Sequence, residues 1–174
     1  MVRFLALIGV IAIVFAVAAA VYFFGGFYNV AALQDDPAIV KSALANVRKA
    51  SISRHAKDSP PASLDDAALI RSGARAFRER GCTNCHGGPG VEWAKFSEGM
   101  RPDPPDLKEV VNDRTAAQVF WVIKNGIDMT GMPSFGSIEV PDQEIWSIAA
   151  FVKKLPTVSD EDFKAWTAPP GGSQ

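Results

Sequence analysis

Apolar residues follow two different patterns along this chain. Residues 4–24 contain no charge and no proline, and nearly all of them are apolar. A helix needs about 20 such residues to cross the hydrocarbon core of a membrane. Beyond residue 30 the apolar residues are interspersed with polar ones and recur at helical spacing. The pattern therefore predicts one membrane-spanning helix followed by amphipathic helices.

The apolar run has two interpretations. Aromatic residues near its end, such as Tyr22, favour the membrane interface and indicate a retained anchor. Arg3, Ala18 and Ala20 also resemble the charged start and the cleavage site of a secretory signal. Because the run continues past these alanines, we favour the first interpretation. We predict a transmembrane anchor, or an uncleaved signal, over residues 1–27.

A connecting helix is expected next, with Asp36 as its N-cap and Pro37 at the first helical position. Its apolar stripe comprises Ile39, Val40, Ala43, Leu44, Val47 and Ala50, and its polar side carries Lys41, Arg48, Lys49, Arg54 and Lys57. We expect this amphipathic helix to rest on the following domain. The alternative is a docking helix for another membrane subunit. Residues 28–62 are assigned to the helix and a linker that ends at a Ser-Pro-Pro sequence.

Three helices are predicted in the middle of the chain. The first begins with Ser63 as its N-cap and Asp66 three residues later, an approximate capping box, and it ends near Glu79. The other two carry apolar residues at helical spacing over residues 115–124 and about 142–155. No strand pattern accompanies them, so the predicted fold class is all-α.

The remaining segments are expected to be irregular. Residues 87–113 are rich in glycine and proline and should be mostly loop. We take residues 63–156 as one domain and residues 157–174 as a C-terminal extension. The composition of its tail, from Ala168 onward, predicts disorder.

Composition and charge narrow the possible functions. The 174 residues include 18 basic and 19 acidic side chains, which gives a formal net charge of −1. This balance provides no electrostatic case for binding nucleic acid. The only two cysteines lie three positions apart, so no disulfide framework organises the domain. A buried cofactor is the organiser that remains.

The chemistry-bearing motif is Cys82-Thr83-Asn84-Cys85-His86, which has the C-x-x-C-H spacing of c-type haem attachment. Thiols at this spacing, at the end of a helix, can reach two vinyl groups along one porphyrin edge. His86 is then placed over the iron as an axial ligand. The predicted cofactor is one covalently attached haem c.

Two other interpretations of the cysteine pair fit less well. A zinc site would need further ligands, but there is no second cysteine pair, and His55 is the only other histidine. A thioredoxin-like redox pair would require a strand before it and a βαβ pattern around it, and the sequence shows neither. Haem attachment is therefore the preferred interpretation.

The second axial ligand is expected to be a methionine, as in many electron-transfer haem proteins. Met132 stands in a loop where Pro133 stiffens the backbone directly after it. Met129 and Met100 remain alternatives, and any of the three could instead fill the core. His55 would give a bis-histidine haem, but it belongs to a basic surface helix.

Residues from about 63 to 156 resemble a mono-haem class I cytochrome c. The resemblance is carried by Gly73-x-x-x-Phe77, the motif at residues 82–86, Pro105-Asp106-Leu107, Met132-Pro133 and the helix at residues 148–151. It implies a class I cytochrome c fold around one covalent haem, here preceded by the transmembrane helix and the amphipathic connecting helix.

The resemblance also implies particular contacts. The first and last helices should cross where Gly73 permits close approach, with Phe77 and Phe151 packed at the crossing. The carbonyl of Pro105 should accept a hydrogen bond from His86, which would orient the imidazole. Phe151 stands where many relatives have tyrosine, so any hydrogen bond from that position is absent.

Side chains around the expected haem are harder to assign. Trp93, Trp121 and Phe135 are candidates to line its pocket. Lys95, Lys108 and Lys124 are candidates to ring its exposed edge and steer an acidic partner. For each of these residues, plain core or solvated surface is the competing interpretation.

Together with residues 99–107, the anchor and the connecting helix resemble membrane-anchored bacterial cytochromes c. The resemblance implies a membrane-tethered one-electron carrier, not an enzyme, in a respiratory or related chain. Its partners would be a membrane dehydrogenase or a terminal oxidase. Because haem c is normally attached outside the cytoplasm, the haem domain would face the periplasm from a single-pass anchor in the bacterial inner membrane.

Two alternative functions stay open. The chain could be a fixed cytochrome c subunit of a larger membrane oxidoreductase complex, with the same chemistry. It could also be a haem-based sensor, which would require an open or displaceable sixth coordination position. The expected methionine ligand argues against the sensor.

Overall fold

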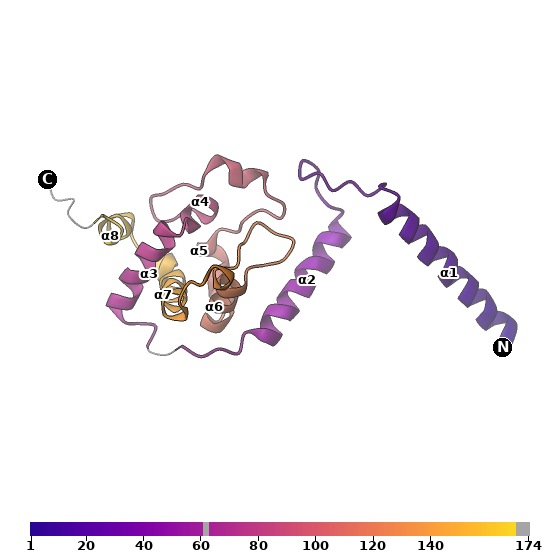
Figure 1. Cartoon of the computed structure of the whole chain (residues 1–174), viewed down its shortest axis with the longest axis horizontal. Helices are drawn as coiled ribbons and strands as arrows, with labels where there is room; N and C mark the ends of the chain where they lie inside the picture. The colour runs from indigo at the N-terminus through magenta and orange to yellow at the C-terminus, as the bar shows by residue number, and fades with distance from the viewer. Residues whose placement is uncertain (61–62, 170–174) are drawn as a thin grey trace. The chain divides into compact units, whose positions relative to one another are not determined.

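The protein is described here by a computed structural model that covers residues 1–60 and 63–169 (Figure 1). Its contacts divide the chain into two units, Met1–Asp35 and Asp36–Gln174, which are treated separately. Within the described ranges the structure is helical, and the β pairing is limited to an isolated bridge between Gly88 and Val91. The predicted all-α fold class is confirmed.

The first unit consists mainly of helix α1 (Val2–Phe24), none of whose side chains is buried. Its 23 residues, at 1.5 Å per residue, span roughly 34 Å, enough to cross a hydrocarbon core of about 30 Å. In the described part of the chain it is the one helix long and apolar enough to do so. At its end the Tyr22 ring packs against Phe23 and Tyr28, with centroids 5.4 and 6.2 Å away. An aromatic cluster of this kind suits the membrane interface.

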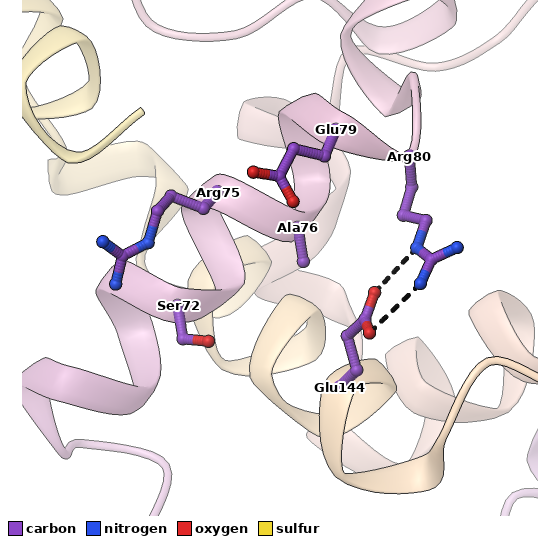
Figure 2. Close-up of a pocket in the computed structure, with 6 residues that line it drawn as sticks. All are labelled: Ser72, Arg75, Ala76, Glu79, Arg80 and Glu144. Atoms are coloured by element: carbon purple, nitrogen blue, oxygen red, sulfur yellow. Dashed lines mark hydrogen bonds and ion pairs between the residues drawn. The ribbon is translucent and has the colours of Figure 1, made fainter. Parts of the chain in front are cut away.

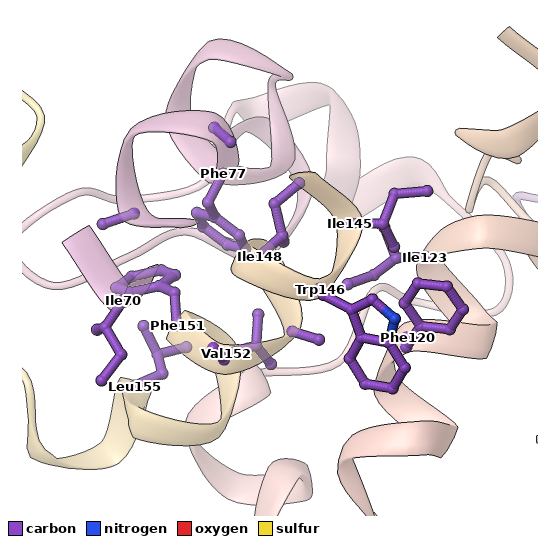
Figure 3. Packing of buried hydrophobic residues seen from close by; sticks show 14 of the residues in the cluster. Ile70, Phe77, Phe120, Ile123, Ile145, Trp146, Ile148, Phe151, Val152 and Leu155 are labelled. Atoms are coloured by element: carbon purple, nitrogen blue, oxygen red, sulfur yellow. The ribbon is translucent and has the colours of Figure 1, made fainter. Parts of the chain in front are cut away.

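The core of the second unit is built on helices α3 (Ala67–Glu79) and α7 (Asp142–Lys154). Both are amphipathic, and α7 buries eight consecutive residues from Ile145 to Val152. Figure 3 shows how Phe77 of α3 and Phe151 of α7 meet, with ring centroids 5.2 Å apart. Gly73 allows this approach, because a methyl group there would lie 1.9 Å from the carbonyl oxygen of Ser147. The crossing that the family resemblance implied is present.

Helix α6 (Ala116–Asn125) packs on α7 at the other side of the core. It starts with the capping box that its sequence permits, between Thr115 and Gln118, and ends at Gly126. Its Phe120 ring stacks on Trp146 of α7 with centroids 4.0 Å apart. The predicted helices at residues 115–124 and 142–155 are therefore confirmed to within one residue at each end.

Helix α2 (Ala38–His55) lies on α6 through one end only. Ile52 is buried, the Gln118 amide donates to the Ser53 hydroxyl over 3.2 Å, and the His55 ring stacks on Trp121. These contacts come from a different face than the apolar stripe that the sequence indicated. Ile39, Leu44 and Val47 of that stripe remain 79%, 52% and 65% exposed.

Two predicted N-caps are wrong: Ser63 by three residues and Asp36 by one. Asp66, not Ser63, caps α3: its carboxylate accepts from the amides of Ala68 and Leu69, so the helix starts nearly a turn later. Pro37 precedes α2 with an extended backbone, so that helix begins at Ala38, and no side-chain hydrogen bond caps it. An acidic side chain able to reach two amides outcompetes a more distant serine.

Short helices occupy part of the region expected to be loop. Within residues 87–113 they are η1 (Lys95–Gly99), α5 (Leu107–Val110) and η2 (Val111–Asp113). Outside that region lie α4 (Cys82–His86), η3 (Gly136–Ile138) and η4 (Leu155–Thr157). The expectation of loop is wrong for residues 107–113. There the Asp106 carboxylate accepts from the Lys108 amide and starts α5.

Helix α8 (Asp160–Trp166) was not predicted. Ser159 caps it, and Phe163 is fully buried against Phe151, with ring centroids 5.5 Å apart. The C-terminal extension thus supplies a core residue. Most of the tail predicted to be disordered, residues 170–174, lies outside the described residues.

Candidate haem site

The two cysteines lie on α4, which follows α3 after a turn at Gly81. Their spacing of three residues places them on the same side of this short helix. Both are partly exposed and unpaired, whereas Thr83 between them is buried. Cys82 also packs against the hydrophobic core, so α4 is attached to the core through Cys82 and Thr83.

His86 ends the same helix, and its Nδ1 lies 2.9 Å from the carbonyl oxygen of Pro105. A carbonyl oxygen can only accept, so Nδ1 carries the proton and donates. The lone pair of the neutral ring is then on Nε2. This is the tautomer in which a histidine coordinates a metal through Nε2 while a backbone carbonyl fixes the ring.

The surroundings of these groups disfavour charge. Burial lowers the pKa of His86, and this effect is opposed by the hydrogen bond to Pro105 and by the Asp106 carboxylate. Burial also raises the pKa of the Cys82 thiol to about 12. A neutral imidazole is the form that binds iron, so the local environment favours the ligating state of His86.

The structure separates the three methionines. Met132 is partly buried and packs against the core. Met129 is 83% exposed and has a positive φ of 58°. Met100 packs against Gly131: a methyl group on that glycine would lie 2.7 Å from the Met100 sulfur. The sequence pattern does not predict this contact. Met100 is thus a neighbour of the Met132 loop and not the distant alternative it appears in the sequence.

The loop that carries Met132 is held by its own hydrogen bonds. The Met132 amide donates to the Thr130 hydroxyl over 3.1 Å, and its carbonyl accepts from the Ile127 amide over 3.2 Å. The Ser134 hydroxyl ties the loop back to α6 by donating to the carbonyl of Lys124. Met132 is therefore presented on a turn connected directly to the core helices.

These residues fit a covalent haem. Two unpaired thiols share one side of α4, the adjacent histidine keeps Nε2 free of protein partners, and a partly buried thioether stands on an ordered loop. No group of three or more His, Cys, Asp and Glu gathers among residues 1–60 and 63–169. The thiols therefore lack the companions of a zinc site, and the donor set is that of a c-type haem.

The aromatic residues proposed to line the haem pocket, and the lysines proposed to ring its edge, lie in different environments. Trp93 is 50% exposed, Phe135 is in the core, and Trp121 faces His55 of α2. Lys124 is paired with Asp142 and Lys95 with Glu98, at 2.8 and 2.6 Å. Two of the three lysines are thus balanced by acidic neighbours, so a ring of unpaired positive charge is not what the structure presents.

A surface hollow of about 440 Å³ lies elsewhere, on α3 and the start of α7 (Figure 2). It is lined by Ser72, Arg75, Ala76, Glu79, Arg80 and Glu144. The Arg80 guanidinium donates twice to the Glu144 carboxylate, over 2.7 and 3.2 Å. None of the predicted haem-binding residues lines this hollow, so it is separate from the candidate haem site.

Comparison with known families agrees with a covalently bound haem c. Residues 68–152 match the family model described as cytochrome c oxidase, cbb3-type, subunit III. No curated protein and no solved structure matches the chain. The matched segment runs from α3 to α7 and includes the Cys-x-x-Cys-His motif and the Met132 loop.

Residues 68–152 thus form a domain of the class I mono-haem cytochrome c family. The protein is an electron-transfer protein that carries covalently bound haem c with its iron. Its N-terminal helix fits a single-pass membrane anchor. Membrane association and redox protein partners follow from this combination.

Proposed function

We propose that the chain is a membrane-tethered one-electron carrier with a His/Met-ligated haem in a respiratory or related chain. Cys82 and Cys85 would form the thioether bonds, and His86 and Met132 would be the axial ligands. The observation that carries the proposal is the His86–Pro105 hydrogen bond, which holds the imidazole in the tautomer needed for coordination through Nε2. When bound, the haem supplies the one-electron redox change.

The protein's own contribution is to hold the ligands with little freedom. Pro105 restrains the His86 ring, and the Thr130 and Ile127 hydrogen bonds restrain Met132. Rigid ligands reduce the rearrangement that accompanies a change of charge at the iron. A thioether as second ligand raises the reduction potential. Both effects suit a carrier rather than a ligand-binding sensor.

The proposed topology follows from the anchor. Residues 1–27 would cross the bacterial inner membrane once, residues 28–62 would connect, and the haem domain at residues 63–156 would face the periplasm. Haem c attachment outside the cytoplasm supports this orientation. A membrane dehydrogenase and a terminal oxidase are the proposed donor and acceptor, with the anchor raising the effective concentration of the domain near them.

Replacing each methionine by leucine tests the ligand assignment. Met132→Leu should abolish the sulfur-to-iron charge-transfer band of the ferric protein, lower the reduction potential and allow carbon monoxide to bind the reduced haem. Met100→Leu and Met129→Leu are matched controls that should retain the band. Loss of the band in Met100→Leu alone would transfer the ligand role to Met100. Carbon monoxide binding by the unsubstituted reduced protein would favour the sensor.

A fixed subunit of a larger complex is the second candidate, because the matching family model is described as an oxidase subunit. A native gel of gently solubilised membranes, stained for covalent haem, separates the two candidates. Migration alone supports the independent carrier. Migration with a large haem-containing assembly supports the subunit, and absence of covalent haem from this chain would contradict both.

A further inference from the structure

Most of the apolar stripe of α2 is left exposed by the domain on which the helix rests, although Val40 is half-buried. Ile39, Ala43 and Val47 recur every four residues and therefore share one face, with Leu44 beside them. The three large side chains are 52–79% exposed. The contacts with α6 come instead from Ile52 and its neighbours. The described part of the second unit thus leaves Ile39, Leu44 and Val47 exposed to whatever lies beside the helix.

Charge indicates what would cover it. Residues 38–57 carry five basic side chains and no acidic one, namely Lys41, Arg48, Lys49, Arg54 and Lys57. An apolar stripe on a basic helix is the composition of helices that lie in the interface of anionic membranes. We therefore take an anionic membrane surface as the occupant, and a protein partner is an outcome that the test below distinguishes.

The membrane anchor is close along the chain. Residues 25–37 link α1 to α2 and, fully extended, reach at most roughly 45 Å. Three apolar side chains in this link, Phe27, Val30 and Leu33, are 68%, 87% and 94% exposed. Exposed apolar residues thus continue from the membrane-spanning helix into the stripe of α2.

We propose that the apolar stripe of α2 lies in the headgroup region of the bilayer that α1 spans, with Lys49, Arg54 and Lys57 on anionic phospholipids. A few apolar residues bind a membrane weakly by themselves. The α1 tether makes the association intramolecular, so weak binding suffices. The inference relies on the anchor of the proposed carrier and not on its haem ligands.

Docking of α2 would restrict how the haem domain is oriented. Ile52 and His55 join α2 to α6, and α6 leads directly into the loop that carries Met132. A helix fixed on the bilayer therefore limits the rotation of the loop relative to the membrane. The candidate haem site, which includes the Met132 loop, would be presented to membrane partners within a narrow range of orientations.

Site-directed spin labelling of the full-length haem protein in vesicles tests this proposal. Val47→Cys places a label on the stripe, and Ser42→Cys, on the polar side of the same helix, is the matched control. The vesicles contain phosphatidylcholine with phosphatidylglycerol. The Val47 label should become accessible to oxygen and lose accessibility to a water-soluble nickel complex, while the Ser42 label should remain accessible to the nickel complex. The haem spectrum of each sample shows separately whether the site is intact.

A charge variant sharpens the test. Lys49→Gln combined with Arg54→Gln should reduce the immersion of the Val47 label in vesicles with phosphatidylglycerol and change little in phosphatidylcholine alone. A Val47 label that stays fully accessible to the nickel complex would overturn the proposal. So would protection only in native membranes, which would indicate a protein partner, or spin–spin broadening that grows with protein density, which would indicate a second copy.

Discussion

Two helix contacts in this protein differ in what holds them. At the α3–α7 crossing, backbone meets backbone: a methyl group on Gly73 would lie 1.9 Å from the Ser147 carbonyl. Phe77 and Phe151 fill the crossing and are at most 1% exposed. At the α2–α6 contact, only the end of α2 takes part, through Ile52, one side-chain hydrogen bond and one ring pair.

The α3–α7 crossing is part of the scaffold of the domain, whereas the α2–α6 contact only attaches α2 to it. Close backbone approach leaves no slack, so the α3–α7 crossing sets the position of α4 and of the Cys-x-x-Cys-His motif that follows α3. The α2–α6 contact leaves most of α2 exposed and thus available to another surface. Variants of each contact should therefore affect different properties of the protein.

The largest effect is expected for Phe151→Ala at the crossing. Phe151 is fully buried between Phe77 and Phe163, with ring centroids 5.2 and 5.5 Å away. Removing the ring should lower the free energy of unfolding by about 4 kcal/mol, because the protein loses the favourable transfer of the ring out of water and also gains an unfilled cavity. Denaturant unfolding of the detergent-solubilised haem protein, followed by circular dichroism, measures this. A loss below that of Ile52→Ala would contradict the ranking of the two contacts.

Gly73→Ala should destabilise by about 3 kcal/mol, since the added methyl group meets backbone that cannot move aside cheaply. Gly99→Ala is the matched control, because nothing lies within 4 Å of a methyl group there. The same unfolding measurement applies. Equal stability of the two variants would show that the helices separate without strain, and that the crossing is not held as tightly as described.

Ile52→Ala tests the other contact. Ile52 is 3% exposed but lies outside the main core cluster. We therefore expect the free energy of unfolding to fall by about 2 kcal/mol, the low end of the range for truncating a buried isoleucine to alanine. The haem spectrum and the reduction potential should be unchanged, while hydrogen exchange over residues 38–55 accelerates. A shifted potential would show that α2 belongs to the haem scaffold rather than being attached to it.

The smallest effect concerns the start of α3. Asp66→Ala should cost about 1 kcal/mol, because its carboxylate caps two amides. Ser63→Ala, at the N-cap predicted from the sequence, should change the free energy of unfolding by only a few tenths of a kcal/mol. Thermal unfolding of the two variants distinguishes these caps. A larger loss of stability for Ser63→Ala than for Asp66→Ala would instead indicate that the helix begins after Ser63.

Short-range patterns were sufficient for much of the fold. Helix α6 was predicted from apolar residues that recur every three or four positions, and the predicted helix is confirmed. The apolar run of α1 is long enough to be recognised by length alone. The Cys-x-x-Cys-His motif is likewise local, and a family model that spans it supports the haem. The individual ligand roles stay predictions.

Tertiary contacts decided the rest. The burial of α2 through Ile52 instead of the Ile39 stripe depends on which neighbour the helix meets, and its own periodicity does not identify that neighbour. Helix α8 and Phe163 gain their stability from Phe151. The approach of Met100 to Gly131 joins segments far apart in the chain. Hydrogen bonds within a few residues can be read from the sequence, whereas burial depends on surfaces that exist only once distant helices have packed.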